Sequence, residues 1–295
     1  MYERHYGLIR TLAPLHVGAS AGEEAGNLNL IFRDAYTQTG IIPGSSIRGR
    51  FRAEMRRRDE AACDYWYGFQ PKAGDTDAIS EGRIKFEYAS LVWMPVFCPG
   101  QPVVWVSCPR LLRRAARTGL CRVSPEKTDG LENTSSQKIA GADVKTDNDK
   151  QVKLFFNLGF MLLDRADADQ QSILASFVPS SFQKDIKIDQ LVVIDDASMG
   201  AIHDMALYRQ SRVKLKDSEK TVENFFNVEA LPEGCMMIFP MAINNYRLLD
   251  QREQRSSPFD EQGNSDSWIG MDLYFGGLES IGFGRCVTTI TEVER

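Results

Sequence analysis

Two glycine-containing segments carry residue types that suit the binding of an anion. The first reads Ile42-Pro43-Gly44-Ser45-Ser46-Ile47-Arg48-Gly49-Arg50-Phe51-Arg52. A turn followed by a helix would leave backbone N–H groups and two hydroxyls at a helix N-terminus, where the helix dipole favours negative charge. Arg48 and Arg52 follow one turn apart on one side of that helix, and we expect Arg48 to face solvent. This pattern predicts phosphate binding.

The second segment is a glycine-dense stretch near the C-terminal end of the sequence. It reads Gly276-Gly277-Leu278-Glu279-Ser280-Ile281-Gly282-Phe283-Gly284-Arg285. Glycines at this density permit the close approach of another backbone or of a phosphate chain. Neither segment has the spacing of a Walker loop or of a dinucleotide-binding turn, so nucleotide hydrolysis and Rossmann-type cofactor binding are not indicated.

Arginine is concentrated in two places in a chain that is acidic overall. Ser45–Arg58 and Pro109–Arg122 together hold eleven arginines and one acid, whereas the rest of the chain holds 24 basic and 39 acidic residues. Arginine presents a planar fork of donors that matches phosphate oxygens. The alternative is that both segments are solvated helix faces. Charge alone does not separate these interpretations.

Periodicity and turn residues predict an α+β chain that places these segments on helices and loops. Ser46–Arg58 is predicted to be a helix with a serine hydroxyl as its N-cap and with Ile47, Phe51 and Met55 on its buried face. A second arginine-rich helix should run from Pro109 to Gly119. Strands are predicted at Tyr6–Val17, Leu28–Phe32, Arg83–Tyr88, Leu91–Phe97, Pro102–Ser107, Val152–Leu163 and Leu191–Ile194. Residues 124–150 are predicted to form a flexible insertion.

With Pro14-Leu15-His16-Val17-Gly18 upstream, the two segments resemble the RAMP superfamily, the repeat-associated RNA-binding proteins of CRISPR systems. That family pairs a strand ending in P-L-H-x-G with an I-P-G-S-S-[LI]-[KR]-G segment and a C-terminal glycine-rich loop. Lys85–Arg113, Leu191–Lys216 and Lys220–Pro240 are similar to the backbone subunit of the type III-B (Cmr) effector complex. The resemblance covers most of the chain.

The resemblance implies a single domain over residues 1–295, built on a ferredoxin-like palm related to the RNA-recognition motif, with inserted thumb-like and lid-like elements. It implies four kinds of partner: guide RNA, target RNA, further copies of the chain in a filament, and other type III CRISPR subunits. RNA binding would require no cofactor. The residues that match the family's RNA-binding motifs are Ser45, Ser46, Arg48, Gly49, Arg52, Gly282, Gly284 and Arg285.

Nuclease activity is the main open question. Target-cleaving members of the family carry a loop aspartate that assists Mg²⁺-dependent cleavage, and the matching position here is Leu28, between Asn27 and Asn29. An amide cannot act as a base and is a poor ligand for Mg²⁺ beside a carboxylate. His16 and Glu229 match positions near the family's cleavage region, and His16 equally suits a structural role at a strand end. The alternative is a guide-processing endoribonuclease that uses His16 as general base and no metal.

Composition and the first residues set the cellular context. The chain opens Met1-Tyr2-Glu3-Arg4-His5 without an apolar signal core, and its apolar runs are interrupted after a few residues. We therefore expect a cytoplasmic protein with no membrane partner. The six cysteines show no C-x-x-C pair, so reduced thiols are favoured over a zinc site drawn from Cys98, Cys108 and Cys121.

Overall fold

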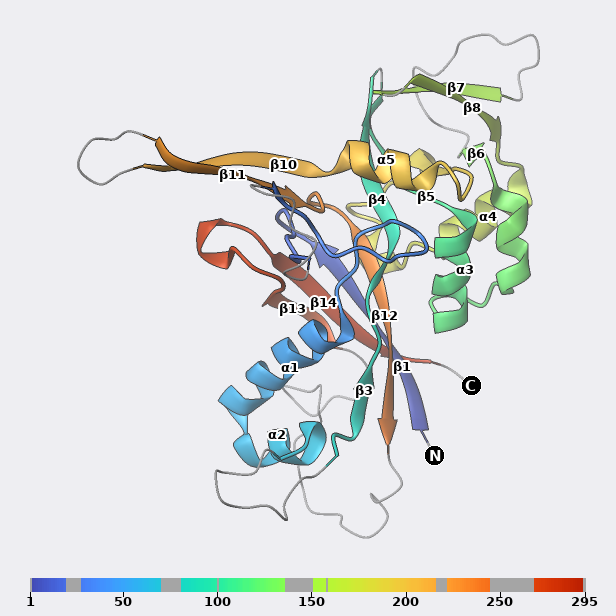
Figure 1. Cartoon of the computed structure of the whole chain (residues 1–295). Coiled ribbons are helices and arrows are strands. Elements are labelled where there is room, and N and C mark those ends of the chain that lie inside the picture. Colours follow the sequence, from blue (N-terminus) through green and yellow to red (C-terminus); the bar gives the residue numbers. More distant parts are fainter. Residues whose placement is uncertain are drawn as a thin grey trace.

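The computed structural model describes residues 2–19, 28–69, 81–99, 101–135, 151–157, 159–215, 222–244 and 268–293. Figure 1 shows a long twisted sheet with helices on both sides and a hairpin that projects from it. Asn27 and residues 136–150 lie outside the described residues. No helix within the described ranges is long and apolar enough to cross a membrane.

An eleven-stranded sheet organises the chain, in the order β13-β14-β1-β12-β4-β5-β9-β6-β8-β7, with β3 also paired to β12. Its strands are β1 (Tyr2–Thr11), β3 (Ile84–Phe86), β4 (Ser90–Cys98), β5 (Gln101–Ser107), β6 (Thr134–Ser135), β7 (Gln151–Phe156), β8 (Gly159–Arg165), β9 (Leu191–Val193), β12 (Met236–Asn244), β13 (Trp268–Tyr274) and β14 (Arg285–Glu292). A three-stranded sheet joins β10 (Tyr208–Leu215), β11 (Val222–Ala230) and β2 (Leu28–Asn29). The helices are α1 (Gly44–Arg58), α2 (Glu60–Tyr67), α3 (Pro109–Thr118), α4 (Ala168–Ser176) and α5 (Met199–Ala206).

Both faces of the central strands β1, β12 and β4 are buried over part of their length, and the neighbouring strand β14 has one buried face. Neighbours in this group run antiparallel, and Leu8 of β1 lies between Ile238 of β12 and Thr289 of β14. Because side chains alternate along a strand, Met237 and Phe239 pack with α1 on one face, whereas Met236 and Ile238 pack with α3 on the other. The sheet thus separates the two arginine-rich helices.

Helix α1 carries its apolar stripe as predicted, with Ile47, Phe51 and Met55 buried. The ring of Phe51 stacks on Phe86 at a centroid distance of 5.7 Å. The prediction of a serine N-cap is wrong, because Pro43 is the N-cap and its carbonyl accepts the first helical hydrogen bonds. Both serines therefore lie within the first turn, where their hydroxyls are not used as caps.

On the opposite face, α3 begins at Pro109 and ends before Gly119, as predicted. Gly119 adopts a left-handed conformation with φ of 104°, which glycine reaches without the steric cost of a Cβ. A 3₁₀ helix, Pro125–Leu131, packs beside α3, and Leu131 is fully buried. Residues 124–135 of the predicted flexible insertion are therefore folded, since they continue the core and supply strand β6.

Candidate RNA-binding site

The three sequence motifs converge through backbone hydrogen bonds. In the glycine loop 276–284, Gly284 N–H donates to Pro14 C=O at 2.8 Å, and Gly277 N–H donates to His16 C=O at 2.9 Å. On the other side of the same segment, Phe32 N–H donates to Val17 C=O at 2.7 Å. Residues 31–42 then lead directly into α1. The P-L-H-x-G segment therefore joins the glycine loop to the strand-like stretch that precedes α1.

The glycine loop is built too tightly for side chains at two of its positions. Gly276 and Gly284 have φ of 78° and 84°. A Cβ would lie 2.1 Å from His16 C=O oxygen at the first position and 2.3 Å from Phe275 C=O oxygen at the second. Gly282 also has a positive φ, of 95°, but no atom lies within 4 Å of the Cβ position, so it faces open space. Close backbone packing explains the first two glycines, and Gly282 remains accessible.

One face of α1 is open. Ser45, Ser46 and Gly49 are exposed, and a Cβ built on Gly49 meets no atom within 4 Å. These residues surround the first turn of a fifteen-residue helix whose opening N–H groups, Gly44 and Ser45, have no partner within the helix. The arrangement presents hydroxyls, backbone donors and the positive end of the helix dipole to a bound anion.

The expectation that Arg48 faces solvent is wrong. Its guanidinium donates to Tyr67 C=O at 2.5 Å, and Arg52 donates to the adjacent Gly68 C=O at 3.3 Å. Both carbonyls lie at the C-terminal end of α2, where helix carbonyls lack intrahelical partners and attract cations. The two arginines share one side of α1 as predicted, and they tie α1 to α2. Arg285 is likewise engaged, in an ion pair with Asp272 at 2.6 Å.

Glu229 is the centre of a buried ion network. Its side chain is 4% exposed, and its two oxygens are divided between two arginines: Arg33 binds Oε2 at 3.0 Å and Arg209 binds Oε1 at 3.0 Å. Arg33 also pairs with Asp204. Glu229 therefore links Arg33 and Arg209, and neither of its oxygens is free of a cation. No sequence motif marked Arg33, Asp204 or Arg209, because only the fold brings these residues next to Glu229 of β11.

His16 lies against the same strand. Its Nδ1 donates to Glu229 C=O at 2.7 Å, and the ring is buried. The neutral ring therefore holds its proton on Nδ1 and presents a lone pair on Nε2. Asn29 pairs with Val228 beside Glu229, so three of the four catalytic candidates are neighbours. The fourth, Asn27, lies outside the described residues.

The described part of this cluster does not fit a Mg²⁺ site. Mg²⁺ prefers free carboxylate and water oxygens. The carboxylates of Glu229 and Asp204 are already paired with arginines, and Asn29 supplies only an amide. Among the described residues no group of three or more His, Cys, Asp or Glu side chains is placed to hold a metal ion.

His203 is fully buried, so its ring does not reach the surface of the site. Its Nε2 accepts from Gly40 N–H at 2.9 Å, which places the ring proton on Nδ1, 3.6 Å from Asp204 Oδ1. Burial lowers the pKa of His203, and the neighbouring His203 ring, followed by the Arg33 guanidinium, holds the pKa of Asp204 at about 2. His203 therefore anchors the residue 31–40 loop to α5.

Comparison of the chain with known protein families and solved structures agrees with this architecture. The profile of the RAMP superfamily matches residues 8–287, and the chain belongs to that superfamily. The fold is similar to a chain of "Type III-B Cmr-beta bound to cognate target RNA", with a TM-score of 0.66 and 16% identity over 97% of this chain and 96% of that one. It is also similar to oligomeric Cmr4 from Pyrococcus furiosus, with a TM-score of 0.61 and 18% identity over 99% of each chain. A search of curated proteins finds no significant match.

Proposed function

We propose that this protein is the backbone subunit of a type III CRISPR ribonucleoprotein, which binds guide RNA along a filament of its own copies and presents complementary target RNA. The observation that carries the proposal is similarity over the whole chain. A RAMP-superfamily chain has the same fold, from end to end, as subunits solved with target RNA and in an oligomeric form.

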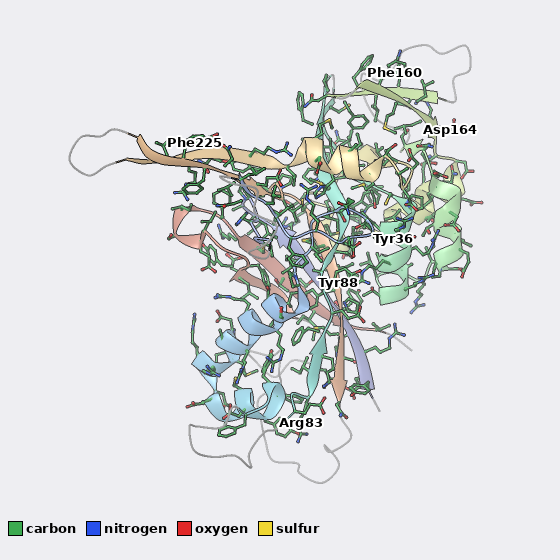
Figure 2. All side chains as sticks on the ribbon, viewed as in Figure 1. Tyr36, Arg83, Tyr88, Phe160, Asp164 and Phe225 are labelled. Atoms are coloured by element: carbon green, nitrogen blue, oxygen red, sulfur yellow. The ribbon has the colours of Figure 1, made fainter. Side chains whose placement is uncertain are left out.

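The central strands supply the palm that the proposal requires. The order β14-β1-β12-β4, with antiparallel neighbours and with α1 in the crossover between β1 and β4, matches the fourth-first-third-second order of a ferredoxin-like sheet. The β10–β11 hairpin projects from this palm and exposes Phe225 (Figure 2), so it corresponds to the thumb-like element.

The guide-binding surface in this proposal is the open face of α1 together with the exposed tip of the glycine loop. Ser45, Ser46, Gly49 and Gly282 are exposed, and a Cβ built on either glycine would meet no atom within 4 Å. The backbone N–H groups and hydroxyls carry no base specificity, which suits a subunit that must hold any guide. Arg48, Arg52, Gly284 and Arg285 support this surface from positions already engaged within the protein.

The proposal is tested with a variant that separates binding from folding. Ser45→Asp/Ser46→Asp places two negative charges at the N-terminus of α1. These charges stabilise the helix through its dipole, and they repel a bound phosphate. We expect guide RNA affinity to fall by about tenfold or more while the melting temperature is unchanged or higher. Ser45→Ala/Ser46→Ala is the uncharged control. Wild-type protein should form multi-subunit assemblies with guide RNA whose affinity falls with salt. Failure to bind any RNA at low ionic strength would exclude the proposal.

Neither form of nuclease activity gains support from the described cluster. Metal-dependent cleavage lacks a free carboxylate, because Glu229 is bound by Arg33 and Arg209. Guide processing lacks an accessible histidine in this cluster, since His16 and His203 are both buried. We expect complementary target RNA to remain intact in the presence of Mg²⁺. A product that disappears when a chelator is added would show that cleavage occurs.

A further inference from the structure

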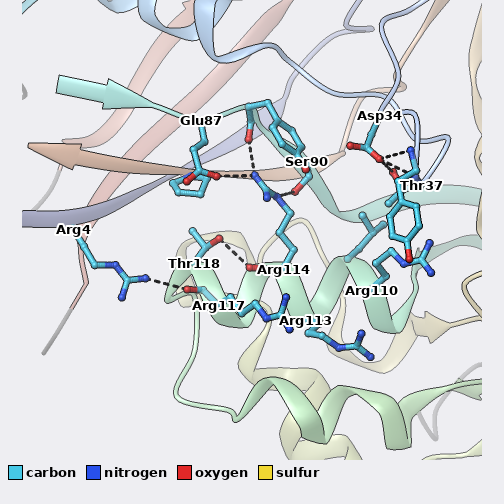
Figure 3. Close-up of a pocket in the computed structure, with 14 residues that line it drawn as sticks. Arg4, Asp34, Thr37, Glu87, Ser90, Arg110, Arg113, Arg114, Arg117 and Thr118 are labelled. Atoms are coloured by element: carbon cyan, nitrogen blue, oxygen red, sulfur yellow. Dashed lines mark hydrogen bonds and ion pairs between the residues drawn. The ribbon is translucent and has the colours of Figure 1, made fainter. Parts of the chain in front are cut away.

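The second arginine-rich segment lines a cavity on the sheet face opposite α1. The cavity has a volume of about 610 Å³, within the size range of ligand pockets. Pro240 of β12 lines it, and Pro240 shares the alternation of Met236 and Ile238, which face α3. Figure 3 shows five arginines directed around it: Arg4 from β1, and Arg110, Arg113, Arg114 and Arg117 from α3. The lining acids are Asp34 and Glu87. Glu87 pairs with Arg114 at 3.4 Å and Asp196 pairs with Arg110 at 3.6 Å, so the positive charge left over comes from the other arginines.

Two of these arginines are held rigidly by aromatic rings. Arg114 lies 3.9 Å from the ring centroid of Tyr88 and donates to Ser90 Oγ at 3.0 Å and to Tyr88 C=O at 3.2 Å. Arg110 lies 3.9 Å from the ring centroid of Tyr36. A guanidinium already fixed in place loses little conformational entropy when it binds a phosphate.

Two others retain unneutralised charge. Arg4 donates to Arg117 C=O at 3.1 Å, and Arg117 is exposed. Across the part of the chain that the structure describes, no carboxylate forms an ion pair with either of them. Arg113 pairs with Asp129, whose side chain is 59% exposed and open to solvent screening. The cavity therefore offers positive charge that the protein does not itself cancel.

Tyr36 adds a feature that a purely electrostatic site would not need. Its side chain is 74% exposed, although Arg110 covers one ring face. The turn that carries it is fixed, since Asp34 Oδ1 accepts from Tyr36 N–H at 2.9 Å and from Thr37 N–H at 2.7 Å. An aromatic face held beside phosphate-binding cations is the combination that binds single-stranded nucleic acid.

The positive surface continues beyond this cavity. Two adjoining cavities, of about 740 and 190 Å³, share Arg4 with it. The larger also shares Arg117 and adds Arg122, and the smaller shares Thr118 and adds Lys85. The three cavities share Arg4 in their linings, and we refer to them together as the track.

We propose that this track, centred on Arg113, Arg117 and Tyr36, binds a second segment of single-stranded RNA, separate from the guide segment at α1. The arginines bind phosphates, and Tyr36 stacks on a base. This inference rests on the proposed function, because it requires that the protein binds RNA. It goes beyond the proposed function by assigning a second RNA segment to the sheet face opposite α1. An acidic protein segment would use the charges but not the exposed ring.

The experiment measures binding of a short fluorescent oligouridine to the full chain. Arg113→Gln/Arg117→Gln removes two charges from the track, and Tyr36→Leu removes the ring but keeps its bulk. Lys184→Gln/Lys187→Gln is the matched control, since both lysines are exposed and the change in net charge is equal. In the Ser45→Asp/Ser46→Asp background, we expect about a tenfold loss of affinity for the arginine pair, with a salt slope shallower by about two. We expect about a fivefold loss for Tyr36→Leu, and no change for the control.

A second readout locates the RNA directly. Photocrosslinking with 4-thiouridine RNA should label the peptide that contains Tyr36 in wild-type protein, and an excess of free UMP should not prevent the labelling. If the track variants keep wild-type affinity and salt slope while Ser45→Asp/Ser46→Asp loses affinity, the inference is overturned and the proposed function stands. Absence of RNA binding by wild-type protein would overturn both. If the track variants no longer self-associate when RNA is absent, the track is a protein interface, and the inference is overturned.

Discussion

Arg48 gives the sharpest test of how the structure revises the sequence-based interpretation. The Arg48→Met substitution keeps most of the aliphatic stem and removes the hydrogen bond to Tyr67 C=O, whose length is 2.5 Å. A hydrogen bond from a charged group contributes about 1.5–3 kcal/mol, and partial exposure places Arg48 toward the lower end. We expect a loss of about 1–2 kcal/mol in the free energy of unfolding, or roughly 2–6 °C in melting temperature.

The matched control is Arg57→Met on the same helix. It removes the same charge, but its side chain is 74% exposed and pairs with Glu54 only at 3.5 Å, so the expected loss is below about 0.5 kcal/mol. Thermal unfolding of both variants, followed by guide RNA titration well below their melting temperatures, separates the two effects. Equal melting temperatures for the two variants, together with an RNA-binding defect confined to Arg48→Met, would refute the role of Arg48 as a link between α1 and α2.

Three further predictions concern stability. Gly284→Ala should lower the melting temperature far more than Gly282→Ala, because both residues have positive φ but only the first would place a Cβ 2.3 Å from Phe275 C=O oxygen; equal losses would contradict this. Tyr67→Phe should stabilise the fold by about 1 kcal/mol in denaturant unfolding, because the buried phenol has no hydrogen-bond partner among the described residues; a loss would show that the hydroxyl is satisfied. Burial lowers the pKa of His203, so the unfolded chain takes up a proton first as the pH falls below about 6.5. The free energy of unfolding should then decrease by up to ~1.4 kcal/mol per pH unit until the folded pKa is reached, and His203→Gln should flatten that slope in unfolding curves at pH 7.5 and 5.5.

Local structure was predictable from the sequence because its causes are local. The spacing of Ile47, Phe51 and Met55 predicted the buried face of α1, and Pro109 and Gly119 marked the bounds of α3. The apolar run Leu91–Phe97 before the Pro99-Gly100 turn likewise predicted β4. Each of these signals depends on residues within a few positions of one another.

The motifs identified the family, but they did not determine what their side chains contact. Arg48 was expected in solvent, and it lies against the end of α2 because the chain returns there nineteen residues later. The same limitation applies to the predicted flexible insertion, whose residues 124–135 fold against α3 and β9. Neither partner is visible in the local pattern, because both contacts join separate segments.

The sequence by itself determined the two arginine-rich helices, the glycine loop and the P-L-H-x-G segment as features suited to binding anions or to packing backbone closely. Only the tertiary structure decided which charges remain free. It neutralises Glu229 between Arg33 and Arg209, joined over sequence separations of 196 and 20 residues, and it places the second arginine cluster beside Tyr36 on the far face of the sheet. The physical reason is that the net charge at a site depends on which side chains lie within a few ångströms, and that proximity is set by the pairing of strands distant in sequence.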